Sequence, residues 1–136
     1  HAAWVADILD LPMIYVRSSA KGHGKQNLVE GRLEQGQRVV LIEDLISTGK
    51  SSIAAGQGVI EAGGDLVSVL AIFTYGLSVA AQRFDEVCMS FATLTDFGTL
   101  MEVAKGNGTL SEDQRQIIAS WQQDPASWSK ERGGAS

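Results

Sequence analysis

The most informative part of the chain is residues 39–52, which read Val39-Val40-Leu41-Ile42-Glu43-Asp44-Leu45-Ile46-Ser47-Thr48-Gly49-Lys50-Ser51-Ser52. The four apolar residues 39–42 predict a β-strand that is buried on both faces. Two adjacent carboxylates follow it, at the end where open α/β sheets bind ligands. The hydroxyl- and glycine-rich turn after them opens a helix, whose free N–H groups form an anion site. This combination suits a ligand with vicinal hydroxyls and a phosphate, such as a ribose 5-phosphate.

The same stretch has a partial match to another phosphate-binding motif. Gly49-Lys50-Ser51 resembles the end of the ATPase loop pattern G-x-x-x-x-G-K-[ST]. That pattern requires glycine at position 44, where this chain has aspartate. A carboxylate there would repel a triphosphate, so we reject an ATPase. An ordinary strand end with a helix cap would explain Ser51 or Ser52, but not the two acidic residues before the turn.

The remaining pattern alternates strands with helices, which predicts an α/β fold with a Rossmann-like parallel sheet flanked by helices. The expected helices cover residues 1–10, 53–62, 78–84, 96–105 and 111–121, and further strands cover 13–16, 66–73 and 87–94. Asp96 and the Ser111–Gln114 capping box are expected to begin two of these helices. Residues 17–38 are expected to form a long loop with room for an edge hairpin. We divide the chain into a core, residues 1–123, and a C-terminal short helix and tail, residues 124–136.

Composition excludes several classes of protein. With 136 residues, of which 44% are hydrophobic, the chain is one globular domain without an apolar run long enough to span a bilayer. The single cysteine, Cys88, cannot form an internal disulfide, which favours the cytoplasm. It lies in the apolar pattern of residues 87–94, so we expect it in the core. The helix positions of Trp4, Trp121 and Trp128 predict packing in the core or at an interface.

A basic cluster stands out in a chain whose net charge is −5, a value that argues against nucleic acid as a partner. Between positions 17 and 38 there are two acidic residues and five basic ones, namely Arg17, Lys21, Lys25, Arg32 and Arg38. Such a cluster in an acidic protein indicates a compact anionic ligand. His23 lies between two glycines in this segment, and the only other histidine is His1. We therefore expect His23 to bind ligand or act in catalysis rather than to hold a metal.

Residues 39–52 resemble the phosphoribosyl pyrophosphate (PRPP) motif of the type I phosphoribosyltransferases, which has four apolar, two acidic and two apolar residues and a Ser/Thr/Gly loop. A second stretch reads Ile14-Tyr15-Val16-Arg17-Ser18-Ser19-Ala20-Lys21-Gly22-His23-Gly24. It resembles the mobile catalytic loop of the orotate phosphoribosyltransferase family, with its arginine, its lysine and histidine two residues apart, and its glycine. Residues 27–31 and 73–77 continue the similarity, which covers roughly residues 1–95.

The resemblance implies a pentosyltransferase that transfers ribose 5-phosphate from PRPP to orotate, giving orotidine 5′-monophosphate and pyrophosphate in pyrimidine (UMP) biosynthesis. It also implies a cytoplasmic homodimer with shared active sites, and Mg²⁺ held mainly by PRPP rather than by a protein metal site. Lys21, His23 and Asp44 would be the catalytic residues, and Ser47 would also contact orotate. The PRPP-binding residues would be Arg17, Lys21, His23, Glu43, Asp44, Leu45, Ile46, Ser47, Thr48, Gly49, Lys50 and Ser51.

The chain departs from the family pattern in two ways. Ser18 and Ser19 stand where the family commonly has a further lysine. The family also has an N-terminal hood, first strand and pyrophosphate loop before the position of His1, so we expect an N-terminally truncated chain with little activity alone. Two alternatives remain, a non-catalytic PRPP-binding regulatory module and a purine or uracil phosphoribosyltransferase. The pattern Lys21-Gly22-His23-Gly24 argues against the second.

Overall fold

The computed structural model describes residues 1–17 and 28–133 and has the predicted α/β class. The elements in chain order are α1 (Ala2–Leu9), β1 (Tyr15–Val16), β2 (Val29–Glu30), β3 (Arg38–Ile46), α2 (Lys50–Glu61), β4 (Asp65–Thr74), α3 (Ser78–Glu86), β5 (Phe91–Asp96), α4 (Phe97–Gly106), α5 (Glu112–Gln123) and α6 (Pro125–Glu131). None of the helices described is long and apolar enough to cross a membrane.

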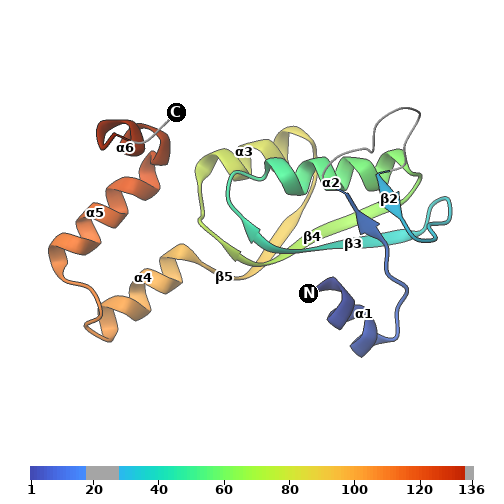
Figure 1. Cartoon of the computed structure of the whole chain (residues 1–136), viewed down its shortest axis with the longest axis horizontal. Coiled ribbons are helices and arrows are strands. Elements are labelled where there is room, and N and C mark those ends of the chain that lie inside the picture. Colours follow the sequence, from blue (N-terminus) through green and yellow to red (C-terminus); the bar gives the residue numbers. More distant parts are fainter. Residues whose placement is uncertain (18–27, 134–136) are drawn as a thin grey trace.

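The centre of the molecule is a parallel three-stranded sheet in the order β3-β4-β5 (Figure 1). Ile42 pairs with Leu70, which in turn pairs with Ala92. The strands are adjacent in chain order and their crossovers share one hand, so both connecting helices, α2 and α3, lie on the same face. A separate antiparallel pair joins β1 to β2, with Tyr15 opposite Glu30. The edge hairpin expected within residues 17–38 is matched only in part, because one of the paired strands lies at residues 15–16, before that segment.

The hydrophobic core lies between this sheet and helices α2 and α3. Its buried members are Ile46, Ile53, Val69, Ala71, Ala80, Phe84 and Met89, with Leu41, Leu66, Val87 and Phe91 packed against them. Phe84 of α3 is completely buried, and its ring centroid lies 4.5 Å from that of Phe91 on β5. The apolar residues of the three strands and two helices therefore meet in one layer.

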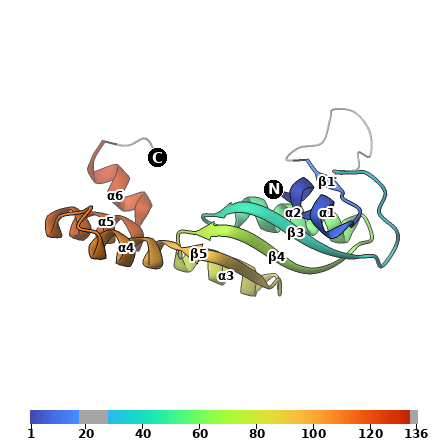
Figure 2. The same cartoon turned by 90° about the horizontal axis from the view of Figure 1, so that it is seen from below.

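The opposite face of the sheet is largely open, which corrects the prediction that residues 39–42 are buried on both faces. Val40 is 45% exposed and Leu70 is 41% exposed. Helix α1 lies on this side of β3, below the strand in Figure 1 and in front of α2 in Figure 2, and an apolar cavity of about 540 Å³ separates it from the strand. A run of apolar residues predicts a strand, but it does not show whether other parts of the chain pack on one face of that strand or on both. In the described part of the chain, one face of β3 is packed by helices.

Several element boundaries differ from those predicted. Strand β3 continues to Ile46, so Glu43 and Asp44 lie within the strand rather than after it. Helix α2 begins at Lys50, three residues earlier than expected. Strand β5 begins only at Phe91. The expected strand 87–94 therefore starts too early, because its first residues form a turn.

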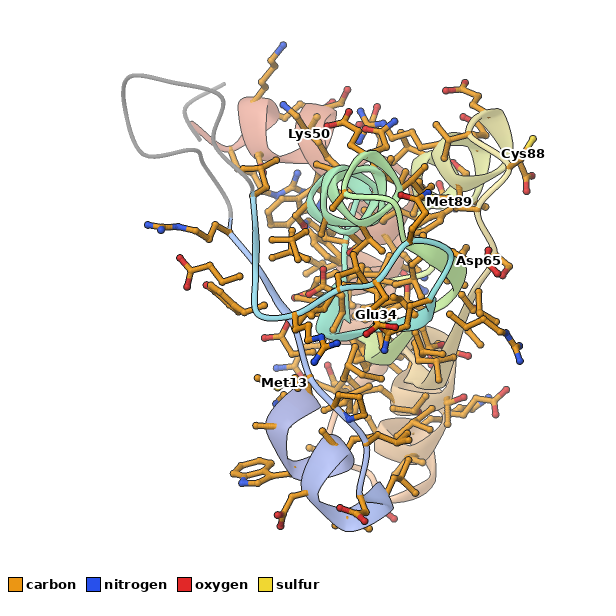
Figure 3. The ribbon with its side chains drawn as sticks, turned by 90° about the vertical axis from the view of Figure 1, so that its right-hand side faces the viewer. Met13, Glu34, Lys50, Asp65, Cys88 and Met89 are labelled. Atoms are coloured by element: carbon orange, nitrogen blue, oxygen red, sulfur yellow. The ribbon has the colours of Figure 1, made fainter. Side chains whose placement is uncertain are left out.

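The prediction that Cys88 is a core residue is wrong. Cys88 lies in the turn after α3, with a φ angle of 53° and its N–H donating to the carbonyl of Asp85. Its side chain is exposed, whereas the next residue, Met89, is buried in the core (Figure 3). Val87 and Met89 produce the apolar pattern because both pack on the core from a turn.

The helix caps and the tryptophans fit the remaining predictions in part. The Asp96 carboxylate accepts a hydrogen bond from Thr99 N at 2.8 Å, and Ser111 forms the expected capping box. Trp121 packs against Tyr75, with ring centroids 5.3 Å apart. Trp4 is 69% exposed on α1, so core packing is excluded for it.

The one-sided core predicts a difference between two valines of β4. Val69 is completely buried and Val67 is 38% exposed. We expect Val69→Ala to reduce the free energy of unfolding by about 2–3 kcal/mol and Val67→Ala by less than about 1 kcal/mol. Urea denaturation of both variants measures this, and equal losses would contradict a core confined to the side of α2 and α3.

Candidate functional site

The candidate site lies at the carboxyl end of β3, in the turn that leads to α2. Because β3 and β4 are parallel, Ile46 and Thr74 pair at the same edge of the sheet (Figure 1). The Thr74 hydroxyl donates to the Ile46 carbonyl at 2.9 Å, and Tyr75 N–H donates to the same carbonyl at 3.3 Å. These bonds fix the position of the β3–α2 turn, residues 47–49, beside the loop that follows β4.

The two carboxylates differ in environment because successive side chains of a strand point to opposite faces. Glu43 pairs in register with Ala71, a core residue, and is half-buried on the α2 side, whereas Asp44 is exposed. Burial raises the pKa of the Glu43 carboxyl, a nearby hydroxyl of Ser52 opposes this rise, and the charge of Asp44 adds to it. Asp44 is therefore the carboxylate that is freely available to a ligand.

The start of α2 leaves main-chain donors available. Gly49 precedes the helix with a φ angle of 77°, and no side chain caps the first turn. The first N–H groups of a helix have no partner within it, and together with the helix dipole they attract an anion. Ser47 and Thr48 precede the helix in the sequence and Ser51 lies in its first turn, so three hydroxyl-bearing residues flank this end of α2. The arrangement is suited to an oxyanion such as a phosphate.

Two residues of α3, Arg83 and Phe84, contact the β3–α2 turn, and the sequence predicts neither contact. Arg83 donates from Nη1 to the Thr48 carbonyl at 3.0 Å. A Cβ atom placed on Gly49 would lie 3.0 Å from the ring of Phe84, so glycine is needed there for space as well as for its φ angle. No sequence signal links these residues to the turn, since Arg83 and Thr48 are 35 positions apart.

Aromatic residues form a wall next to the turn. Tyr75 contacts Phe73 and Trp121 edge-on, with ring centroids 5.5 and 5.3 Å apart, and lies near Phe97. Gln122 of α5 donates to the Tyr75 carbonyl at 2.9 Å. Helix α5 is thereby tied to the loop that follows β4, at the edge of the sheet that carries the site.

The predicted site residues do not all lie together. The side chain of Ile46 is completely buried, so this residue can offer only main-chain atoms to a ligand. Arg17 lies beyond the end of β1 and forms an ion pair with Glu30 at 2.6 Å. Its neighbour Val16 packs near Gly58, eight residues along α2 from Lys50. Lys21 and His23 lie outside the described residues.

In the described part of the chain, a metal ion would bind best where several His, Cys, Asp or Glu side chains converge. No group of three or more His, Cys, Asp or Glu side chains lies close enough together there to hold a metal ion. Glu43 and Asp44 remain as two oxygen donors at the end of β3. Mg²⁺ commonly keeps several waters and binds one or two carboxylates together with substrate phosphates. Because Glu43 and Asp44 point to opposite faces of β3, either of them could supply one such carboxylate, but they are not placed to bind the same ion together.

Comparison with curated proteins gives consistent relatives, although no family model matches the sequence. Orotate phosphoribosyltransferase of Fusobacterium nucleatum is 52% identical over 121 residues, which are 89% of this chain and 57% of the relative. The enzymes of that name from Coxiella burnetii and Listeria monocytogenes are 49% and 48% identical over 94% and 96% of this chain. The chain spans 57–62% of the length of these relatives.

Solved structures agree in fold. Orotate phosphoribosyltransferase from Aeropyrum pernix superposes with a TM-score of 0.68 at 26% identity, covering 81% of this chain and 59% of that one. The Mycobacterium tuberculosis enzyme of the same name, in complex with PRPP, gives a TM-score of 0.53 at 27% identity over 67% of this chain and 54% of that one. A Leishmania donovani UMP synthase, at 23% identity and a TM-score of 0.73, shares the fold.

The raised pKa of Glu43 predicts how stability depends on pH. Ionisation of a carboxyl whose pKa is raised by folding opposes folding above its ordinary value of 4.5, and this penalty disappears below it. Glu43→Gln is therefore expected to increase the free energy of unfolding at pH 7 and to give a smaller increase at pH 4. Urea denaturation at both pH values measures this, with Glu86→Gln on α3 as an exposed control. A loss of stability at pH 7 would contradict the prediction.

Proposed function

Because the chain belongs to the orotate phosphoribosyltransferase family, we propose that the protein containing it transfers ribose 5-phosphate from PRPP to orotate in pyrimidine biosynthesis in the cytoplasm. The observation that carries this proposal is the placement of the acidic pair and the β3–α2 turn at one edge of the sheet. A ribose 5-phosphate needs acceptors for its hydroxyls and donors for its phosphate, and this edge offers both.

The ribose and its phosphate would bind at the carboxyl end of β3. Asp44 and Glu43 would accept hydrogen bonds from the ribose hydroxyls. The 5-phosphate would accept bonds from the turn and the first turn of α2, through residues 47–51. Leu45 and Ile46 would contribute main-chain atoms, and Ser47, the first residue of the turn, would also lie near orotate. A half-buried Glu43 suits this role because a hydroxyl donor would favour its ionised form.

The pyrophosphate would be held by Arg17, Lys21 and His23 of a neighbouring subunit. Val16, next to Arg17, packs near Gly58, and eight helical residues separate Gly58 from Lys50. At 1.5 Å per residue this is roughly 12 Å along α2. Arg17 therefore begins its segment well away from the anion site of its own chain. A homodimer that exchanges this segment between subunits would bring both halves of the site together.

The chemistry is a displacement at C1 of the ribose. The bond from C1 to the pyrophosphate oxygen breaks and its electron pair leaves with pyrophosphate, while a ring nitrogen of orotate forms the new bond to C1. Negative charge develops on the leaving group, so the cationic side chains of Arg17 and Lys21 would stabilise it. Mg²⁺, held mainly by PRPP, would neutralise part of the same charge when bound.

Activity and binding can be tested separately. Residues 1–136 joined to the part of the Fusobacterium nucleatum relative that they do not match should consume orotate in the presence of PRPP and Mg²⁺. The same chimera should not use adenine, guanine or uracil. Use of those bases in place of orotate would overturn the assignment. Binding of PRPP by calorimetry without turnover would instead favour a regulatory module.

Asp44 gives a prediction for ribose binding. Asp44→Asn in the chimera should raise the dissociation constant for PRPP about 10- to 100-fold, because a hydrogen bond to a charged acceptor is lost. Asp65→Asn is the matched control, since Asp65 lies at the amino end of β4, at the opposite edge of the sheet. Calorimetry measures both variants, and equal affinities would remove Asp44 from the site.

Lys21 gives a prediction for the chemical step. Lys21→Ala should lower kcat about 100-fold or more and change the affinity for PRPP much less, because the leaving group gains charge only in the transition state. Steady-state kinetics on the chimera measure this, with Lys105→Ala at the end of α4 as control. An unchanged kcat would exclude Lys21 from the mechanism.

A further inference from the structure

The contact between α3 and the β3–α2 turn has a consequence for the orientation of one peptide. Gly49 has φ and ψ angles of 77° and −8°. These values match the third position of a type II turn, near +80° and 0°. The same position of a type I turn has φ near −90° and ψ near 0°, and the two forms differ by a flip of the peptide that precedes it. Here that peptide joins Thr48 to Gly49.

Glycine makes such a flip easy. Gly49 has no side chain to penalise either sign of φ, and the ring of Phe84 leaves no room for one. The packing against Phe84 therefore requires glycine at position 49, and glycine restricts its own backbone conformation less than any other residue. Another contact is needed to select one orientation of the peptide between Thr48 and Gly49.

Arg83 supplies that contact. Its guanidinium donates to the Thr48 carbonyl at 3.0 Å from a half-buried position on α3. In a trans peptide the C=O and N–H groups point in opposite directions, and no cis peptide occurs in the described part of the chain. With the Thr48 carbonyl held toward α3, the Gly49 N–H points away from α3. Gly49 is a buried residue, and its N–H forms no main-chain hydrogen bond within the described residues, which leaves this donor for a ligand bound at the turn.

We propose that Arg83 is a positioning residue that holds the peptide between Thr48 and Gly49 so that the Gly49 N–H faces the 5-phosphate of the substrate. This proposal rests on the proposed function, in which the β3–α2 turn binds that phosphate. In the flipped peptide the Thr48 carbonyl would face the phosphate instead and repel it. Arg83 also polarises the peptide from its far side, which strengthens the N–H as a donor.

The test measures phosphate binding together with the state of Gly49. Arg83→Met keeps the aliphatic stem but removes the donor, and Arg83→Lys restores one donor. Inorganic phosphate and PRPP are titrated into the ¹⁵N-labelled chimera and followed by the Gly49 amide resonance. Arg83→Met is expected to raise the dissociation constant for inorganic phosphate about 5- to 10-fold and to reduce the Gly49 shift at saturation. Arg83→Lys should recover most of both changes.

Controls separate this role from a general effect on folding. Arg115→Ala removes another partly buried arginine, which pairs with Glu112 on α5, and should leave phosphate affinity unchanged. Thermal unfolding should show Arg83→Met folded, and residual dipolar couplings should then show both orientations of the peptide between Thr48 and Gly49. If Arg83→Met binds phosphate as tightly as the parent, the role of Arg83 is overturned and the proposed function stands. If the parent binds neither phosphate nor PRPP, both proposals fail.

Discussion

The parallel pairing of β3 with β4 is the constraint on which the rest of the structure depends. Two parallel strands need a crossover, and α2 supplies it by running back along one face of the sheet. Helix α2 must therefore begin at the carboxyl end of β3, directly after Ile46. The Ile46 carbonyl accepts bonds from the Thr74 hydroxyl and from Tyr75 N–H, which closes this end of the sheet. Carboxylates, hydroxyls and free N–H groups meet there because the topology brings them to one edge.

That edge of the sheet is less stable than other residues could make it, as the proposed anion site requires. Helices α4 and α5 have side-chain caps from Asp96 and Ser111, whereas α2, which begins at Lys50 after Gly49, has none, and α1 and α3 also lack one. An aspartate or serine cap would occupy the N–H groups that a phosphate needs, and a carboxylate would also repel it. Glu43 likewise carries a burial penalty that an apolar residue would avoid. Each feature lowers the stability of the fold, and the phosphate and ribose of the proposed substrate would supply the missing partners.

The sequence predicts those parts of the fold and site that depend on local order. Residues 39–52 are contiguous, so the pattern alone predicts the strand and the turn into a helix, although it places the acidic pair after the strand when the pair lies within β3. The caps at Asp96 and Ser111 are likewise predicted from local sequence. The burial of each face of β3 could not be predicted from local sequence, because it depends on which other elements pack on the sheet. The contact of Arg83 with Thr48 joins residues 35 positions apart and has no local signature. The pattern of residues 87–94 wrongly predicts that Cys88 is buried in a strand, because a turn can carry apolar residues as a strand does.

Arg17 lies at the end of β1, apart from the carboxyl end of β3. The Arg17 guanidinium forms an ion pair with Glu30 at 2.6 Å, across the β1–β2 pair. A partly exposed ion pair of this kind contributes at most about 1 kcal/mol, less than two charge-assisted bonds to a pyrophosphate. Glu30 can therefore pair with the Arg17 guanidinium without competing strongly against a pyrophosphate for it. Val16 lies near Gly58, toward the far end of α2 from Lys50, so Arg17 starts at a distance from its own chain's β3–α2 turn. Under the proposed function, the ribose phosphate would bind to residues of one subunit, whereas the pyrophosphate would need residues from a second subunit.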